Sequence, residues 1–127
     1  MPHFGTNSKK HRDTCHPDLQ KVLNEAIKHF DFSCIWGHRS QAQQDRIFED
    51  GFSQVQWPNS KHNPYPSRAF DVVPYPGGYQ NSDETFYLMA THILAAASLH
   101  GVRLKWGGHW KNFKDLAHFE LIGDSSD

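Results

Sequence analysis

Cysteine is scarce in this sequence, and long apolar runs are missing from it. The chain has two cysteines, Cys15 and Cys34, and they do not form a C-x-x-C pair. Two such residues make no disulfide framework for a domain of this size, so we interpret both as reduced thiols. No apolar run approaches the length of a membrane span, and the polar first ten residues lack the apolar part of a secretory signal peptide. We therefore expect a protein that is made in the cytoplasm and does not insert into a membrane.

An excess of positive charge is also absent. Thirteen Lys and Arg residues are balanced by fourteen Asp and Glu, which gives a formal net charge of −1. Proteins that bind nucleic acids through their phosphates usually carry a basic excess, so we expect no nucleic-acid partner.

Histidine and aromatic residues are abundant instead. The chain has ten His, nine Phe, four Tyr and four Trp, which excludes a disordered chain. Its 127 residues suit one domain, residues 1–127. We predict that the polar first fifteen residues, 1–15, form an arm that wraps around the domain or frays.

Hydrophobic spacing predicts alternating helices and strands. Apolar residues at helical spacing follow Pro17, a residue favoured in the first turn of a helix. Ser40 and Gln43 have the spacing of a capping box at the start of a second helix. This order indicates an α+β fold, with about three helices packed on a small, mainly antiparallel sheet. We predict helices at 17–30, 41–50 and 83–100, strands at 32–36, 69–73, 102–106 and 117–121, and a loop at 52–68.

Two of the predicted strands carry a polar residue among apolar neighbours. These residues are Asp71, within 69–73, and His118, within 117–121. A polar side chain inside a short apolar strand must find a partner. His62 precedes the proline-rich loop that leads to Asp71. Two His and one Asp are a well-known set of zinc ligands, and a catalytic site leaves the fourth position to water. We predict that these three residues bind Zn²⁺, although the sequence leaves cobalt and manganese open.

Asp115 would complete a hydrolytic mechanism. It lies three residues before His118. A carboxylate there can reach a water on the metal, whose pKa zinc lowers to about 7. Asp115 could take the proton of that water and later return it to a leaving amine.

Four short motifs occur in a fixed order along the chain, and a tryptophan- and glycine-rich stretch, 106–110, precedes the last one. Together they resemble the zinc peptidases of the D-Ala-D-Ala carboxypeptidase and L-alanyl-D-glutamate peptidase family, which have the Hedgehog/DD-peptidase fold. Asp rather than Glu at position 115 resembles the phage endolysin branch. His62 and Asp71 are nine positions apart, further than in the common form of the family. A longer loop can bulge outward and keep both ligands in place. The motifs are Gly37-His38-Arg39-Ser40, Ser60-Lys61-His62, Ala69-Phe70-Asp71 and Asp115-Leu116-Ala117-His118.

The resemblance implies a role for each matching residue. Asp115 would be the general base and then the acid. Arg39 would stabilise the oxyanion or hold a substrate carboxylate, since a guanidinium donates two parallel hydrogen bonds. Ser60 would hydrogen-bond the substrate backbone, and Trp110 would line the cleft. The zinc ligands that the resemblance implies are His62, Asp71 and His118.

The function implied by the resemblance is hydrolysis of an amide bond in the peptide stem of bacterial peptidoglycan. The base motif favours an L-alanyl-D-glutamate endopeptidase of the phage endolysin type. We expect a monomer that stays in the host cytoplasm until it is released to the cell wall at lysis. A D-Ala-D-Ala carboxypeptidase of the same family and a non-catalytic zinc domain that binds wall peptide are the alternatives. A His-metal nuclease is disfavoured by the balanced charge.

Several candidate residues also have simpler interpretations. Arg39 could form a surface ion pair, and Asp115 could be an exposed turn residue. Cys34 alternates with apolar residues and fits the core better than a nucleophile. His38 and His109 flank predicted site elements, so either one could contact substrate.

Overall fold

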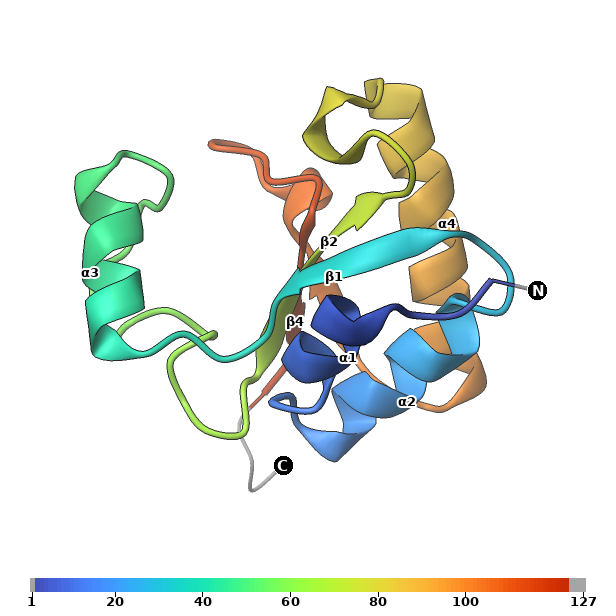
Figure 1. Ribbon diagram of the computed structural model, residues 1–127, viewed down its shortest axis with the longest axis horizontal. Helices are drawn as coiled ribbons and strands as arrows, with labels where there is room; N and C mark the ends of the chain where they lie inside the picture. Colours follow the sequence, from blue (N-terminus) through green and yellow to red (C-terminus); the bar gives the residue numbers. More distant parts are fainter. Residues whose placement is uncertain (1, 124–127) are drawn as a thin grey trace.

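The computed structural model describes residues 2–123 as an α+β fold, in which helices surround a four-stranded antiparallel sheet (Figure 1). The α+β class and the antiparallel sheet are confirmed. The helices are α1 (Thr6–Arg12), α2 (Pro17–Ala26), α3 (Gln41–Glu49) and α4 (Asp83–Leu99), and the strands are β1 (Phe32–Trp36), β2 (Ala69–Pro74), β3 (Leu104–Trp106) and β4 (His118–Leu121). Short 3-10 turns lie at Gly78–Gln80 and Gly107–His109.

The order of the sheet, β1-β2-β4-β3, puts β2 and β4 at its centre. Every residue of β2 is buried. In the register of these two strands, Asp71 lies directly opposite His118. Cross-strand partners of an antiparallel pair project to the same face of the sheet, so the pairing brings these two polar side chains together.

The two faces of the central strands differ in polarity, because successive side chains point to opposite faces. Phe70 on β2 and Phe119 on β4 are fully buried and stack with their ring centroids 5.4 Å apart. They join a hydrophobic core to which α2 and α4 contribute, and these two helices pack against each other. His118 and Glu120 alternate with the apolar residues of β4. The largest completely buried side chains from the two helices are Leu19, Leu23, Met89 and Ile93.

Residues 37–67, which include α3, form a different kind of structure that we call the polar lobe. Figure 1 shows α3 standing apart from the other helices, on the opposite side of the sheet from α4. Within this lobe, no hydrophobic side chain belongs to the buried core. Its buried side chains are all polar: Arg39, Gln44, Ser60, His62, Asn63 and Ser67.

The N-terminal segment differs from the polar arm that we predicted for residues 1–15. Thr6–Arg12 form α1, which packs against β1. Phe4 is buried, and its ring meets that of Phe32 edge-on at 5.3 Å. The Ser8 hydroxyl accepts a hydrogen bond from the backbone N–H of Cys34 at 3.0 Å, which satisfies a donor on an edge strand. One aromatic contact and one side-chain hydrogen bond to β1 thus hold a segment whose composition is polar.

The other predicted elements have different ends in the structure. The helix predicted for 17–30 ends at Ala26, and tight turns follow it. The strand predicted for 102–106 begins at Leu104, because the N–H of Val102 bonds to the carbonyl of Ala97 and closes the end of α4. Gly101, with φ of 68°, provides the left-handed residue that this helix end requires.

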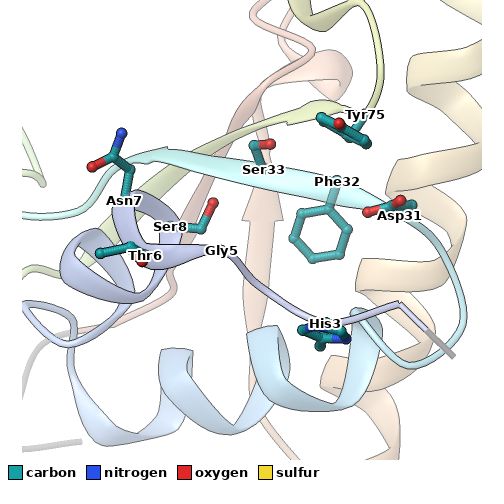
Figure 2. A pocket seen from close by; sticks show the side chains of 9 residues that line it. All are labelled: His3, Gly5, Thr6, Asn7, Ser8, Asp31, Phe32, Ser33 and Tyr75. Carbon is teal, nitrogen blue, oxygen red and sulfur yellow. The ribbon is translucent and has the colours of Figure 1, made fainter.

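A pocket of about 500 Å³ lies between the N-terminal segment and β1 (Figure 2). None of the predicted site residues lines it. Its lining residues are His3, Gly5, Thr6, Asn7, Ser8, Asp31, Phe32, Ser33 and Tyr75. Within residues 2–123, no helix has the length and apolar character needed to cross a membrane.

Candidate metal centre

Three buried side chains from two parts of the molecule converge at one point. Asp71 and His118 come from the paired central strands, and His62 comes from the polar lobe. Each offers one ligand atom, and these atoms all lie within 4.8 Å of one another. Within the described part of the chain, this is the one such group of His, Cys and carboxylate residues. The structure therefore brings together the three ligands predicted from the sequence.

The spacing of the ligand atoms fits a small tetrahedral metal ion. His62 Nε2 lies 3.2 Å from Asp71 Oδ1 and 3.3 Å from His118 Nδ1, and the third side, from His118 Nδ1 to Asp71 Oδ1, is 2.9 Å. Tetrahedral zinc with bonds of about 2.0–2.1 Å requires ligand atoms roughly 3.3 Å apart. The donor set and its dimensions thus fit zinc with a fourth position left for another ligand.

In each of the three side chains, the nitrogen or oxygen that faces away from the centre makes a hydrogen bond. In the two histidines this bond sets which ring nitrogen carries the proton. His62 Nδ1 donates to the carbonyl of Gly37 at 2.7 Å, which leaves Nε2 as the lone-pair donor for a metal. His118 Nε2 donates to the carboxylate of Glu120 at 2.8 Å, which leaves Nδ1 for the metal. Such outer hydrogen bonds fix the tautomer and the ring orientation of metal-binding histidines. Asp71 Oδ2 accepts a hydrogen bond from Arg39 at 2.7 Å, while Oδ1 faces both imidazoles.

The charge balance of the centre keeps Asp71 ionised. Burial alone raises the pKa of its carboxyl, but the charges and hydrogen bonds of His62 and His118 lower the pKa well below its usual range. For His118, burial lowers the pKa, whereas hydrogen bonds to Asp71 and Glu120 raise it to about 9. In the metal-free protein, a proton on Nδ1 therefore occupies the side of the ring that a metal would use.

Asp115 lies beside this centre, at the turn before β4. Its N–H donates to the carbonyl of Gly107, and its Oδ1 accepts the N–H of Ala117 at 3.2 Å, which orients the carboxylate. Burial raises the pKa of Asp115, and the negative charge of Asp71 raises it further, against the opposing charge of His118. A carboxyl group with a raised pKa is suited to accepting and returning a proton.

Arg39 occupies a position that the sequence did not reveal. The residue is 7% exposed, and its two terminal nitrogens donate to Asp71 at 2.7 Å and to Gln44 at 3.3 Å. Its guanidinium also lies 5.0 Å above the ring of Trp36. These contacts make Arg39 a support for the ligand Asp71, in a buried ion pair rather than a surface one.

The remaining predicted contacts lie close to the centre. The Ser60 hydroxyl accepts the N–H of His62 at 3.2 Å, so it orders the ligand loop. The ring of Trp110 lies 5.2 Å from that of His118, next to the metal position. His38 packs edge-on against Tyr65, and His109 packs against Trp106.

Two residues of the centre were missed by our sequence reasoning. Glu120 stands two positions after His118 on a strand, and that spacing places both side chains on one face. The alternation could have identified it. Gln44, which contacts Arg39, is a glutamine in a polar helix, and nothing in its sequence neighbourhood distinguishes it from a surface residue.

Known proteins resemble almost the whole chain, and not only the candidate metal centre. Residues 2–122 match the model of a family described as phage L-alanyl-D-glutamate peptidase. The L-alanyl-D-glutamate peptidase of Escherichia phage T5 is 32% identical over 123 residues, which covers 93% of this chain and 88% of the phage protein. The crystal structure of the Serratia marcescens L-Ala D-Glu endopeptidase ChiX superposes with a TM-score of 0.79 at 32% identity. It covers 94% of this chain and 90% of ChiX.

The family match, the similarity to the T5 and Serratia peptidases and the converging metal ligands agree with one another. The chain therefore belongs to the phage L-alanyl-D-glutamate peptidase family.

Proposed function

We propose that this chain is a zinc-dependent endopeptidase that cleaves the bond between L-alanine and D-glutamate in the peptide stem of bacterial peptidoglycan. The observation that carries the proposal is the convergence of His62, Asp71 and His118, with Asp115 beside them, in a member of this family. The names of the T5 and Serratia relatives support the choice of bond. Zinc is the metal that two imidazoles and one carboxylate favour when a position is left open.

The chain supplies the groups that such a reaction requires. A zinc ion held by the three ligands would polarise the scissile carbonyl and make a water molecule acidic enough to attack at neutral pH. Asp115 takes up the proton of the attacking water on its carboxylate and later delivers it to the leaving amine. Its raised pKa favours the protonated state that this second step needs.

Other residues keep the site in the required state. Glu120 holds the ring of His118 so that Nδ1 faces the centre. Arg39 holds the carboxylate of Asp71 and brings a positive charge near the position where negative charge develops on the substrate. We propose that Ser60 and Trp110 contact the substrate, since each lies next to a metal ligand.

The alternatives are less well supported. A D-Ala-D-Ala carboxypeptidase would use a cation to grip a terminal carboxylate, but Arg39 is already paired with Asp71. A non-catalytic binding domain has no need for a half-buried carboxyl group with a raised pKa beside its metal ligands.

The relationship to a phage peptidase supports a role as a lysis enzyme. We propose that the protein works as a monomer and reaches the cell wall when the host is lysed.

The test is mass spectrometry of purified muropeptides after incubation with the protein, with and without a chelator. We expect one new product pair, from cleavage between L-Ala and D-Glu, which disappears with the chelator and returns when zinc is added. Loss of a terminal D-Ala instead would assign the carboxypeptidase activity. Intact muropeptides in the presence of bound zinc would overturn the enzyme proposal.

A further inference from the structure

The polar lobe carries α3, and this helix is attached to the rest of the molecule in an unusual way. A surface helix normally buries an apolar stripe against the core. In α3 the one buried side chain is Gln44, which is fully buried. Hydrogen bonds made by this glutamine therefore contribute directly to the attachment of α3, beside the half-buried Ile47 and Phe48.

The amide of Gln44 uses all of its hydrogen-bonding capacity. Oε1 accepts from Arg39 and from the side chain of Asn63, each at 3.3 Å. Nε2 donates to the hydroxyl of Ser53 at 3.0 Å and to the carbonyl of Val55 at 2.8 Å. A primary amide can make about four hydrogen bonds. Gln44 thus joins α3, the loop after it and the segment that carries a metal ligand.

The two residues that donate to Gln44 Oε1 each contact or adjoin a predicted metal ligand. Arg39 donates to Asp71 at 2.7 Å through its other terminal nitrogen, and its backbone N–H donates to the carbonyl of His62. Asn63 follows His62 directly and accepts the N–H of Ser60 on its side-chain oxygen. Any shift of Gln44 therefore changes the support of two of the three ligands.

We propose that Gln44 is a positioning residue that couples the placement of α3 to occupation of the metal centre. The inference rests on the proposed zinc site and adds a consequence to it. Bound zinc would hold Asp71 and His62 in place, and these two residues contact or adjoin Arg39 and Asn63. Both Arg39 and Asn63 donate to the amide oxygen of Gln44, which belongs to α3. Zinc binding would therefore restrict the motion of α3. Because coupling between two sites is reciprocal, loosening α3 must also weaken zinc binding.

The test compares Gln44→Met, which keeps the approximate volume but removes the amide, with a matched control, Gln41→Ala. Gln41 is an exposed residue of the same helix. Hydrogen exchange is followed by mass spectrometry on the metal-free and zinc-loaded forms of each protein. In the wild type and in the control, we expect zinc to slow exchange in α3 and in residues 52–63. In Gln44→Met that slowing disappears, while α2 and α4 exchange as in the wild type.

Two further readouts separate positioning from a general loss of structure. Zinc affinity should fall on the order of tenfold in Gln44→Met, the size expected for an outer partner of metal ligands, and stay unchanged in Gln41→Ala. The absorption spectrum of the cobalt-substituted protein, which reports ligand geometry, should change in the first variant only. If Gln44→Met fails to fold, Gln44→Glu provides a second comparison, since it keeps the acceptor for Arg39 but loses the donors to Ser53 and Val55. By the same reciprocity, exchange in 52–63 should become faster and zinc affinity should fall below the wild-type value, and unchanged affinity together with faster exchange would overturn the coupling.

Failure of this inference is distinguishable from failure of the proposed function. A wild-type protein that binds no metal at the three ligands would contradict the zinc site itself. Zinc binding with no change of exchange in α3, or wild-type zinc affinity in a folded Gln44→Met, would overturn the coupling alone. Neither outcome depends on measuring peptidase activity.

Discussion

The hydrophobic body of the molecule and its polar lobe are stabilised by different interactions. In the body, α2 and α4 pack against each other and the sheet around side chains that are completely buried, such as Leu19 and Phe119. In the polar lobe, residues 37–67, the buried side chains are polar and are held by hydrogen bonds. The first region gains its stability from removing apolar surface from water, whereas the second depends on the geometry of individual bonds.

The candidate metal centre lies where these two regions meet. The sheet contributes Asp71 and His118 in a fixed register, and the lobe contributes His62 through a network that ends on the same carboxylate. One site is thus built partly from the packed sheet and partly from the hydrogen-bonded lobe. We therefore expect substitutions in the hydrophobic body to change mainly the stability of the fold, and substitutions around the metal ligands to change mainly metal affinity.

The largest expected effect is on the turnover number, from a substitution of Asp115 beside the candidate metal centre. Asp115→Asn keeps the hydrogen bond to Ala117 but removes the proton acceptor, so the turnover number should fall roughly 10²–10⁴-fold. Zinc content and thermal stability should stay at wild-type values. The measurement is the rate of muropeptide cleavage together with metal analysis of the purified variant. Full activity in this variant would contradict the assignment of Asp115 as the base.

A truncation in the hydrophobic body should reduce stability regardless of the metal. Leu19→Ala removes a completely buried side chain, and such changes cost about 2–5 kcal/mol in free energy of unfolding. Denaturant unfolding should show a similar loss with and without zinc. The control Leu99→Ala changes a residue that is 71% exposed and should have little effect. A loss in Leu19→Ala that zinc abolishes would show that the two regions are not separate.

A substitution around the metal should do the reverse. In Glu120→Gln the acceptor for His118 Nε2 loses its charge, so we expect zinc affinity to fall about 10–100-fold with a small change in stability. Glu49→Gln, at the exposed end of α3, is the matched control. Competition with a chromophoric chelator measures both affinities. Equal affinities in the two variants would exclude a role for Glu120 in orienting the ligand.

The smallest predicted effect, over a single pH unit, is the dependence of zinc affinity on pH. Hydrogen bonds to Asp71 and Glu120 overcome burial and raise the pKa of metal-free His118 to about 9. Below that pH zinc must displace a proton, so its apparent affinity should fall about tenfold for each unit of pH. In the metal-free protein, the same raised pKa stabilises the fold below the ordinary value of 6.5, and this contribution is lost as the pH rises through about 9. Affinity that does not change between pH 7 and 9 would contradict this account.

The sequence was informative where a residue conflicts with its neighbours. Asp71 and His118 stand out because a polar residue in an apolar strand needs a partner, and the structure places them opposite each other. The start of α3 was also predictable, since Ser40 and Gln43 form the expected capping box. The same reasoning failed for the N-terminal segment, where a single Phe4 anchors a polar helix.

Hydrogen-bond networks could not be predicted from the pattern. The buried position of Gln44 is invisible in a sequence, because a glutamine in a polar helix is normally exposed. The pairing of Arg39 with Asp71 joins residues 32 positions apart and depends on the fold of the whole lobe. Polar contacts of this kind become visible only when the geometry is known.

The most direct test of the account is anomalous X-ray diffraction at the zinc absorption edge, from crystals grown with zinc. We predict one strong peak about 2.0–2.2 Å from His62 Nε2, Asp71 Oδ1 and His118 Nδ1, with Glu120 still bonded to His118 Nε2 and Asp115 outside bonding distance of the metal. A zinc ion bound by Asp115, or found elsewhere while the three ligands stay bonded to one another, would contradict the proposed centre.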